Sequence, residues 1–291
     1  MVGNKKYYAH FKQENVRTNP SDSKYFSFDN GVISINPNYR NTFAGKLTIP
    51  KQFDGKDVTE IGDFANMPLL THVFFEDENN SKCVKVGNYA FAVNQGLEED
   101  GTRANTSLIG VYLPNSIRAI GNYAFIQCIK LEHVSLNDEI TSIGDHAFSA
   151  YSYGDLIIFN IPNLVLEKIP EKLTYLGAYA FYGCNKVAFD SIPDGISELK
   201  TQTFVNCHNL KISNFNNITK IDGYCFYAAF APEVTHLIFS KVVEIGGEAF
   251  GNNAYQNVNR ITTTATNYET IYGVFGDTRN GVDISYDLLD G

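Results

Sequence analysis

Leu131-Glu132-His133-Val134-Ser135-Leu136 begins the stretch that decides the fold, and Asn137-Asp138-Glu139-Ile140-Thr141-Ser142-Ile143-Gly144 and Asp145-His146-Ala147-Phe148 complete it. In the first piece Leu131, Val134 and Leu136 are expected to face the core. His133 and Ser135 point the other way, as in a short strand with one buried face. A turn rich in Asn and Asp, a second apolar pair and a glycine follow. We predict a strand, a corner, a tight bend at Gly144 and one helical turn that carries Ala147 and Phe148.

The end of this stretch, an aliphatic residue followed five positions later by Phe, occurs seven times in the chain. Successive Phe residues are 34, 23, 33, 23, 22 and 24 positions apart, so a unit recurs and two copies carry an insertion. A fixed period of about 20–50 residues indicates a stacked array of units. No unit can bury its apolar edge alone, so the rings are expected to form one continuous stack: Phe91, Phe125, Phe148, Phe181, Phe204, Phe226 and Phe250.

The cysteines follow the same period. An odd count of five in a long chain does not indicate a disulfide framework. Cys128, Cys184 and Cys207 each fall three residues after a repeat Phe, and Cys225 takes a position where other copies have Ala. We predict that these four are small buried hydrophobic residues, and only Cys83 lies off the pattern.

The composition argues against binding to nucleic acid or insertion into a membrane. The chain has 291 residues and a formal charge of −9, whereas a sequence-independent hold on nucleic acid needs clustered Lys and Arg. No stretch is as long and apolar as a membrane helix, and residues 1–10 lack the apolar core of a secretory signal. As written, the chain is expected to stay where it is made. An extracellular role would need a leader that had been removed, or release by cell lysis.

The two ends of the chain depart from the repeat and predict caps. Residues 1–46 lack the unit, and the alternation from Tyr25 to Ile35 predicts a β-hairpin with its turn at Asp29-Asn30-Gly31. Residues 47–263 hold the repeats. In residues 264–291 the repeat pattern breaks down, and residues 282–286 alternate as in an edge strand. We therefore predict an N-terminal β-hairpin cap, a repeat array and a C-terminal cap of β structure, because the open ends of a solenoid must be covered.

The repeat resembles the BspA-like class of leucine-rich repeats, whose unit reads approximately L-x-x-I-x-I-P, a short spacer and V-x-x-I-G-x-x-A-F-x-x-C. Leu47-Thr48-Ile49-Pro50 and Val58-Thr59-Glu60-Ile61-Gly62 match it, although Asn66 stands where Phe is expected. The likeness extends from about Leu47 to Thr263, three quarters of the chain. It implies a curved solenoid, mainly β with short helical turns and a parallel sheet on its concave side. It also implies roles in adhesion and protein binding instead of catalysis.

The sequence contains no pattern that is typical of a catalytic or metal site. It has no glycine-rich phosphate loop, zinc spacing, nucleophile elbow or calcium-loop pattern, so we expect a protein that is not an enzyme and needs no cofactor. His72, His133 and His236 fall at the third place of their strands and would line the concave sheet in one row. Because other units intervene between them, hydrogen bonding or partner contact is expected there, not a metal site.

The outward positions of the predicted concave sheet are the candidate binding site. Exposed aromatic and aliphatic side chains on a sheet indicate either a partner footprint, in which Tyr, Phe and Arg are favoured anchors, or positions that loops and caps cover. Both interpretations stay open. We place the candidate site on this strip: His72, Phe74, Tyr112, His133, Ser135, Ile158, Asn160, His236, Ile238 and Arg260.

Two insertions are the other candidates for binding. Residues 92–107 are polar and contain glycine, and residues 149–155 together with 163–172 form a second excursion. Extra loops in repeat arrays often lie on one face and bind, but tolerated surface length explains them equally well.

The sequence favours a non-enzymatic interaction protein that presents a rigid surface to a protein or a surface glycan, in attachment or recognition. Two settings stay open: a bacterial surface adhesin supplied without its leader, and a bacteriophage virion component made in the cytoplasm, such as a tail, fibre or capsid-associated protein. A competing hypothesis is a structural subunit that self-associates or assembles into a larger particle, and a stable monomer would disfavour it. An upstream secretion signal, or neighbouring portal and capsid genes, would choose between the two settings.

Overall fold

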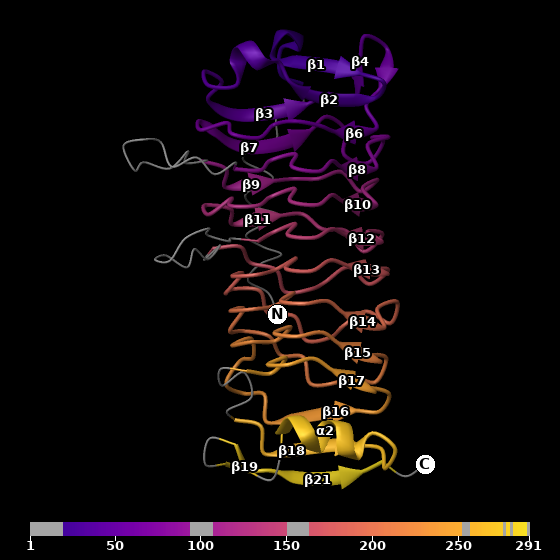
Figure 1. Cartoon of the computed structure of the whole chain (residues 1–291). Helices are drawn as coiled ribbons and strands as arrows, with labels where there is room; N and C mark the ends of the chain where they lie inside the picture. The colour runs from indigo at the N-terminus through magenta and orange to yellow at the C-terminus, as the bar shows by residue number, and fades with distance from the viewer. Residues whose placement is uncertain are drawn as a thin grey trace, which may run out of the picture.

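The chain winds as a β-solenoid of about nine coils stacked in one column (Figure 1). The computed structural model describes residues 20–93, 107–149, 163–251, 257–275, 278–279 and 282–289. The colours of Figure 1 run along the column in chain order, so neighbouring coils in space are neighbours in sequence. One continuous hydrophobic cluster extends from Phe26 to Ile284 through all of these coils. The repeat solenoid predicted from the sequence is therefore the observed fold.

The first two strands of the described residues form an antiparallel hairpin, as the alternation from Tyr25 to Ile35 predicts. Strand β1 (Phe26–Asp29) pairs with β2 (Val32–Ile35), and Asp29 lies opposite Val32. The two residues between them, Asn30 and Gly31, both have positive φ, at 47° and 86°, as two-residue hairpin loops require. Two 3-10 turns, η1 (Ser23–Tyr25) and η2 (Pro37–Tyr39), flank the hairpin, and a small antiparallel pair, β4 (Gln52–Phe53) and β5 (Lys56–Asp57), follows.

The second apolar pair of the repeat forms short parallel strands along one side of the solenoid. These strands stack in register, so that Ile120 lies between Val86 and Ile143. One sheet has the order β1-β2-β6-β8-β10-β12-β13 and another has the order β14-β15-β17. Their bounds are β6 (Glu60–Ile61), β8 (Lys85–Val86), β10 (Ala119–Ile120), β12 (Ser142–Ile143), β13 (Tyr175–Leu176), β14 (Glu198–Leu199), β15 (Lys220–Ile221) and β17 (Glu244–Ile245).

The first strand of the repeat forms two separate parallel sheets in the described residues, where one continuous concave sheet was expected. One has the order β11-β9-β7-β3 and the other has the order β16-β18-β21. Between them lie only isolated bridges, such as Leu210 to Phe230. In two copies within this interval, at Val187 and Leu210, the second apolar residue follows two positions after the first instead of three. This shift interrupts the ladder of hydrogen bonds. The bounds are β3 (Gly45–Ile49), β7 (Leu70–Phe75), β9 (Gly110–Val111), β11 (His133–Val134), β16 (His236–Phe239), β18 (Arg260–Thr263) and β21 (Ser285–Leu288).

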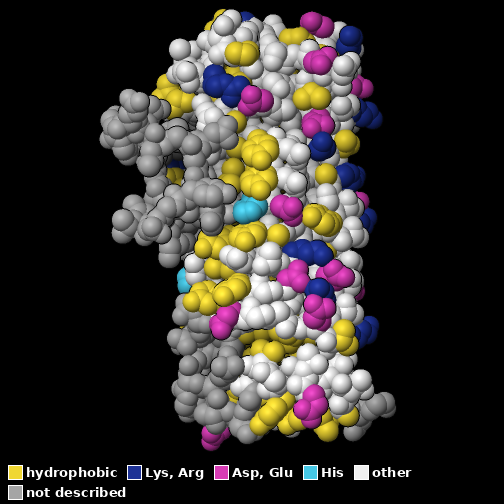
Figure 2. Space-filling view, in the orientation of Figure 1, with side chains coloured by type: hydrophobic (Ala, Val, Ile, Leu, Met, Phe, Trp, Pro, Cys, Tyr) yellow, Lys and Arg dark blue, Asp and Glu magenta, His cyan; other side chains and the backbone are white. Residues whose placement is uncertain are grey.

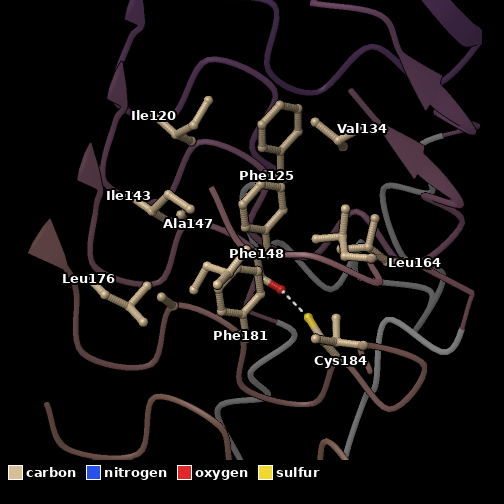
Figure 3. Close-up of a cluster of buried hydrophobic side chains, with 14 of the residues drawn as sticks. Ile120, Phe125, Val134, Ile143, Ala147, Phe148, Leu164, Leu176, Phe181 and Cys184 are labelled. Atoms are coloured by element: carbon tan, nitrogen blue, oxygen red, sulfur yellow. Dashed lines mark hydrogen bonds between the residues drawn. The ribbon is translucent and has the colours of Figure 1, made fainter. Parts of the chain in front are cut away.

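The repeat phenylalanines form the predicted stack in the core. Phe125, Phe148 and Phe181 lie one above another in Figure 3, with ring centroids 5.1 and 5.4 Å apart and interplanar angles of 5° and 3°. All three side chains are fully buried. Aliphatic residues of the second strand line one side of the stack in the figure, and Cys184 lies on the other. Each coil therefore buries its ring by covering the ring of the next coil.

The stack extends one ring further towards the N-terminus than the sequence predicts. Asn66 occupies the expected Phe position, but Phe64, two residues earlier, takes the place in the stack and lies 5.8 Å from Phe91. Its backbone N–H donates to the carbonyl of Ala90, as that of Phe91 donates to Ala124. In this coil the ring follows Ile61 by three positions instead of five, and it still occupies its place in the stack.

The glycine of the repeat has a different role from the predicted tight bend. Gly144 does not have positive φ; that conformation occurs two residues later, at His146, where φ is 54°. A Cβ on Gly177 would lie only 2.4 Å from the backbone nitrogen of Asp145 and 2.5 Å from the carbonyl carbon of Gly144. Glycine is therefore needed for close approach of adjacent coils. The segment with Ala and Phe is a hydrogen-bonded turn in the described coils, not a helical turn.

The C-terminal end combines a helix with strands, whereas the sequence predicts β structure alone. Helix α2 (Tyr268–Phe275) places the fully buried Phe275 next to Phe250, with ring centroids 5.1 Å apart. Strand β21 then adds to β18 in parallel, so an edge strand is present but begins three residues later than predicted. A short antiparallel pair, β19 (Thr278–Arg279) and β20 (Val282–Asp283), precedes it. The helix therefore covers the ring of Phe250, the last of the repeat phenylalanines.

All five cysteines are free and buried. The thiol of Cys128 donates to the carbonyl oxygen of Phe91 at 3.1 Å, and those of Cys184 and Cys207 make the same contact one coil back. Burial raises the pKa of Cys83 to about 12 and raises that of Cys128 further. The prediction of small buried hydrophobic residues is confirmed, and Cys83 joins them.

We expect the native protein to be inert towards thiol reagents. Reaction needs the exposed thiolate, and burial removes both access and ionisation. Titration with a chromogenic disulfide at about pH 8 should find almost no reactive thiol in the native chain and all five after denaturation. Fast reaction of one thiol in the folded protein would contradict the buried positions.

Candidate binding surface

The predicted strip begins at the N-terminal first-strand sheet, where three of its side chains are buried. The rings of Phe74 and Tyr112 stack with centroids 4.8 Å apart and an interplanar angle of 3°, and His72 lies 6.2 Å from Phe74. All three residues are less than 9% exposed. These three side chains do not form the open face expected of a partner footprint. They are covered, which was the other interpretation left open, and their rings pack against one another.

His133 and Ser135 follow on β11 and just after it, and both are half-buried. His133 lies beside Gly110, which in turn lies beside His72, so the two imidazoles flank a residue without a side chain. The Ser135 hydroxyl accepts from the N–H of Leu113 at 2.6 Å and so joins neighbouring coils. Within the described residues no three His, Cys, Asp or Glu side chains come together as a metal site would require.

The C-terminal first-strand sheet keeps its outward face accessible. His236, Arg260 and Ser285 lie side by side on β16, β18 and β21, and Ile238 lies in the next row beside Thr262. Arg260 is exposed and its Nε lies 2.5 Å from a carboxylate oxygen of Asp287. The His236 imidazole lies 2.8 Å from the Thr262 hydroxyl. Three of the predicted site residues, His236, Ile238 and Arg260, therefore share one exposed or half-buried face.

Ile158 and Asn160, the remaining predicted residues, lie outside the described residues. Val165 and Leu166 connect the neighbouring coils at the position of the first strand. The N–H of Val165 donates to the carbonyl of Glu132, and the carbonyl of Leu166 accepts from the N–H of Ala188. Leu164, Leu166 and Ile169 are buried, so residues 163–172 contribute to the core and are not the surface excursion that was predicted, although their charged side chains are exposed. Of the two insertions, residues 94–106 and 150–162 also lie outside the described part.

The sequence reasoning missed a second surface, on the side of the Phe-bearing turns. Tyr89, Tyr123, His146 and Tyr179 occupy equivalent positions in four coils and stack ring on ring, with centroids 4.8, 4.8 and 4.4 Å apart. We call these four residues the tyrosine ladder. Figure 2 shows hydrophobic side chains and a histidine along the middle of one long face. The signal was available in the sequence, since each of these residues stands two positions before a repeat Phe.

The side of the second strands is polar and charged. Lys85 pairs with Glu60 at 3.0 Å, and Lys220 pairs with Glu244 at 2.8 Å, in both cases between adjacent coils. Such exposed pairs contribute little to stability. They make this side a solvated face.

The family of the chain is decided by the repeat itself. A family model described as BspA type Leucine rich repeat region matches residues 99–167 and 158–279 with six copies, which together cover more than half of the chain. The chain belongs to the BspA-type leucine-rich repeat family. The unit quoted at the start, with its strand, corner, glycine and Phe, is the family unit, and the buried Phe stack is what that unit builds. No curated protein matches the chain.

Three solved structures are similar to this BspA-type protein, one of them with a TM-score above 0.5. The leucine-rich repeat protein TpLRR of T. pallidum is 19% identical, with a TM-score of 0.54, over 91% of this chain and 100% of that one. A leucine-rich repeat protein from Bacteroides ovatus is 18% identical, with a TM-score of 0.41, over 84% of this chain and 70% of that one. A leucine rich cell surface protein from Faecalibacterium prausnitzii is 17% identical, with a TM-score of 0.35, over 96% of both. At this level of identity, the similarity to TpLRR shows a shared fold and nothing about function.

Among the described residues of this BspA-type chain, no helix has the length and apolar character needed to cross a bilayer.

We expect the stability of the BspA-type fold to fall as the pH drops from about 7.5 to about 5.5. Burial, with Lys46 and His133 nearby, lowers the pKa of His72 below its ordinary 6.5. Below that value the unfolded chain takes up the proton more readily than the folded chain, so stability is lost as pH falls. Urea unfolding of wild type and His72→Phe at both pH values checks this: the variant should lose less stability. An identical loss of stability in both proteins would show that His72 does not cause the pH dependence.

Proposed function

We propose that this chain is a non-enzymatic protein-binding module that acts in attachment or recognition at a bacterial surface. The BspA-type family is generally associated with surface proteins that bind protein or mediate adhesion. The continuous core makes every coil rigid, so that outward side chains are held in place before a partner arrives. A preformed surface binds with little loss of conformational entropy.

The observation that carries this proposal is the exposed face of the C-terminal first-strand sheet. On three paired strands, Arg260 and His236 stand beside one another, and the half-buried Ile238 lies in the adjoining row. A cation, an imidazole and an aliphatic residue on a flat sheet form the mixture of polar and apolar groups that protein interfaces use. Arg is also among the residues that most often dominate binding energy.

Binding of the full chain to two panels tests the proposal, one of immobilised purified surface proteins and one of surface glycans. We expect saturable binding to a protein, weakened at least tenfold by Arg260→Ala with Ile238→Ala. A matched control is Lys241→Ala, an exposed residue in the loop after β16. Binding that both variants leave unchanged would move the site away from this sheet. Binding only to glycans would overturn the proposed partner class.

A further inference from the structure

Tyr224 lies on the turn side of the solenoid, at the backbone position that the tyrosine ladder uses in earlier coils. It stands two residues before the repeat Phe226, and its φ is 57°, in the left-handed region that residues with a Cβ seldom adopt. The same position holds Gln202 one coil earlier and Glu248 one coil later, with φ of 55° in both. The fold therefore accepts a polar side chain at this position and does not require a ring.

The ring of Tyr224 is accessible, because its neighbours do not cover it. Tyr224 is 45% exposed. Among the described residues, the one ring that contacts it is that of Tyr227, with centroids 5.8 Å apart and planes tilted by 49°, so no ring lies flat on it. In the coil before, the Gln202 amide donates to the Tyr179 hydroxyl at 2.9 Å and is thus directed towards the preceding coil.

Tyr227 lies against a residue of the next coil that has no side chain. It follows Phe226 directly, and Gly251 holds the same position after Phe250. The two coils are adjacent here, since the N–H of Ala228 donates to the carbonyl of Gly251 at 3.2 Å. A Cβ on Gly251 would lie 2.7 Å from Cδ2 and 3.0 Å from Cε2 of the Tyr227 ring. Glycine therefore lets this ring lie close to the backbone of the next coil.

The carboxylate of Glu248 lies at the same place. Its Oε2 is the atom nearest to the point that a Cβ on Gly251 would occupy, so the carboxylate and the Tyr227 ring converge there. The N–H of Tyr224 donates to the carbonyl of Gly247 at 3.1 Å, which sets Glu248 beside Tyr224. Glu248 is exposed, and within the described residues its carboxylate has no ion-pair partner.

A similar pair of rings two coils earlier lacks this carboxylate. Tyr179 and Tyr182 lie 6.1 Å apart with planes tilted by 34°. The coil after them holds Gln202 at the position of Glu248, and its amide donates to the Tyr179 hydroxyl. The carboxylate beside the rings therefore distinguishes the coil of Tyr224 from this earlier one.

Two aromatic rings beside an unpaired carboxylate suit a cation. The faces of tyrosine rings attract a cation that lies within about 6 Å of the ring centroid. The planar guanidinium of arginine can stack on a ring while its N–H groups bond a carboxylate, whereas the ammonium of lysine is a compact, strongly hydrated charge. The formal charge of −9 on the chain also attracts a basic partner at long range.

We propose that Tyr224, Tyr227 and Glu248 bind an arginine side chain of a basic partner protein. We call these three residues the arginine site. The guanidinium donates to the Glu248 carboxylate and lies against the ring of Tyr224, and Tyr227 borders the site on one side. The arginine site shares no residue with the face of the C-terminal sheet, so it adds a second contact surface to the one proposed above.

Fluorescence anisotropy of a short labelled peptide of alternating Arg and Gly, titrated with the full chain at physiological salt, tests the proposal. Glu248→Gln and Tyr224→Gln each remove one element of the site, and Gln202 shows that this backbone position accepts Gln. Exposed cation–π contacts and ion pairs each change affinity by roughly two- to fivefold, so we expect that loss for each variant and about tenfold for both together.

Glu244→Gln is the matched control, because it makes the same change of charge at an exposed carboxylate that pairs with Lys220 on the second-strand side, at 2.8 Å. It should bind the peptide within about twofold of wild type. An equal loss in Glu248→Gln and Glu244→Gln would reduce the binding to overall charge and overturn the site, as would a chain that does not bind the peptide. Circular dichroism of each variant should match that of wild type.

Two comparisons test the choice of arginine. A peptide with Lys in place of Arg should bind more weakly, and ethylguanidinium should displace the Arg peptide better than tetramethylammonium does. Equal binding of the two peptides, or better displacement by tetramethylammonium, would overturn the assignment to a guanidinium. The variant Arg260→Ala with Ile238→Ala should not weaken binding of the Arg peptide, so this proposal and that of the C-terminal sheet fail separately.

Discussion

Phe148→Ala should destabilise the protein by about 3–5 kcal/mol, the usual cost of truncating a fully buried Phe. The side chain is fully buried and stacks on Phe125 and Phe181, at 5.1 and 5.4 Å. Removing this ring takes a contact from each neighbour and leaves a cavity in the middle of the stack. Because coils before and after it share one core, the loss should appear as a single cooperative shift of the unfolding transition.

Chemical denaturation of wild type and Phe148→Ala, monitored by circular dichroism, measures this effect. Leu69→Ala is a matched control, since Leu69 is 46% exposed and surface truncations usually change stability by under about 0.5 kcal/mol. A Phe148→Ala variant as stable as the control would show that the ring stack does not stabilise the solenoid.

Gly177→Ala should also destabilise the protein, by about 1–3 kcal/mol, as extra groups forced into packed sites do. The added Cβ would meet the Asp145 backbone nitrogen at 2.4 Å, and rigid backbone cannot move aside as a side chain does. It would also disturb the hydrogen bond from the Ala178 N–H to the Asp145 carboxylate, now 2.9 Å long. Adjacent coils would have to separate.

The next coil shows what such a separation looks like. There Lys200 stands in place of the repeat glycine, and the parallel sheet that ends at β13 does not continue into β14. The step from Phe181 to Phe204 is 6.0 Å, longer than the 5.4 Å step before it. At Lys200 a side chain thus coincides with a looser contact between coils, whereas the next coil, with Asp222 at the equivalent position, keeps its strand pairing and a ring step of 5.4 Å.

Gly273→Ala is the matched control for Gly177→Ala. Gly273 lies within helix α2, and an added Cβ would meet nothing within 4 Å. Alanine is favoured over glycine inside a helix by about 0.5–1 kcal/mol, so this variant should be slightly more stable than wild type. Thermal unfolding of both variants should therefore shift in opposite directions. A Gly177→Ala variant as stable as wild type would show that the coils are not closely packed there.

The candidate site was less predictable than the fold, for a physical reason. Alternation along a strand tells which side chains leave the core of their own coil, but it does not tell what else covers them. His72, Phe74 and Tyr112 leave the main core and are nevertheless buried together, whereas Arg260 leaves it and stays exposed. The difference depends on which rings meet across strands that are far apart in sequence.

The spacing of apolar residues, glycine and Phe by itself determined that this chain is a stacked array, where its repeat Phe rings and four of its thiols lie, and that residues 26–35 form a hairpin. Those features follow from local periodicity, because each coil must present the same apolar edge to the next. Only the tertiary structure decided that Phe64 replaces the expected ring at Asn66, that the first-strand sheet divides in two, and that a tyrosine ladder lines the turns. These depend on how neighbouring coils register and how closely they approach, and a pattern within one coil does not contain that information.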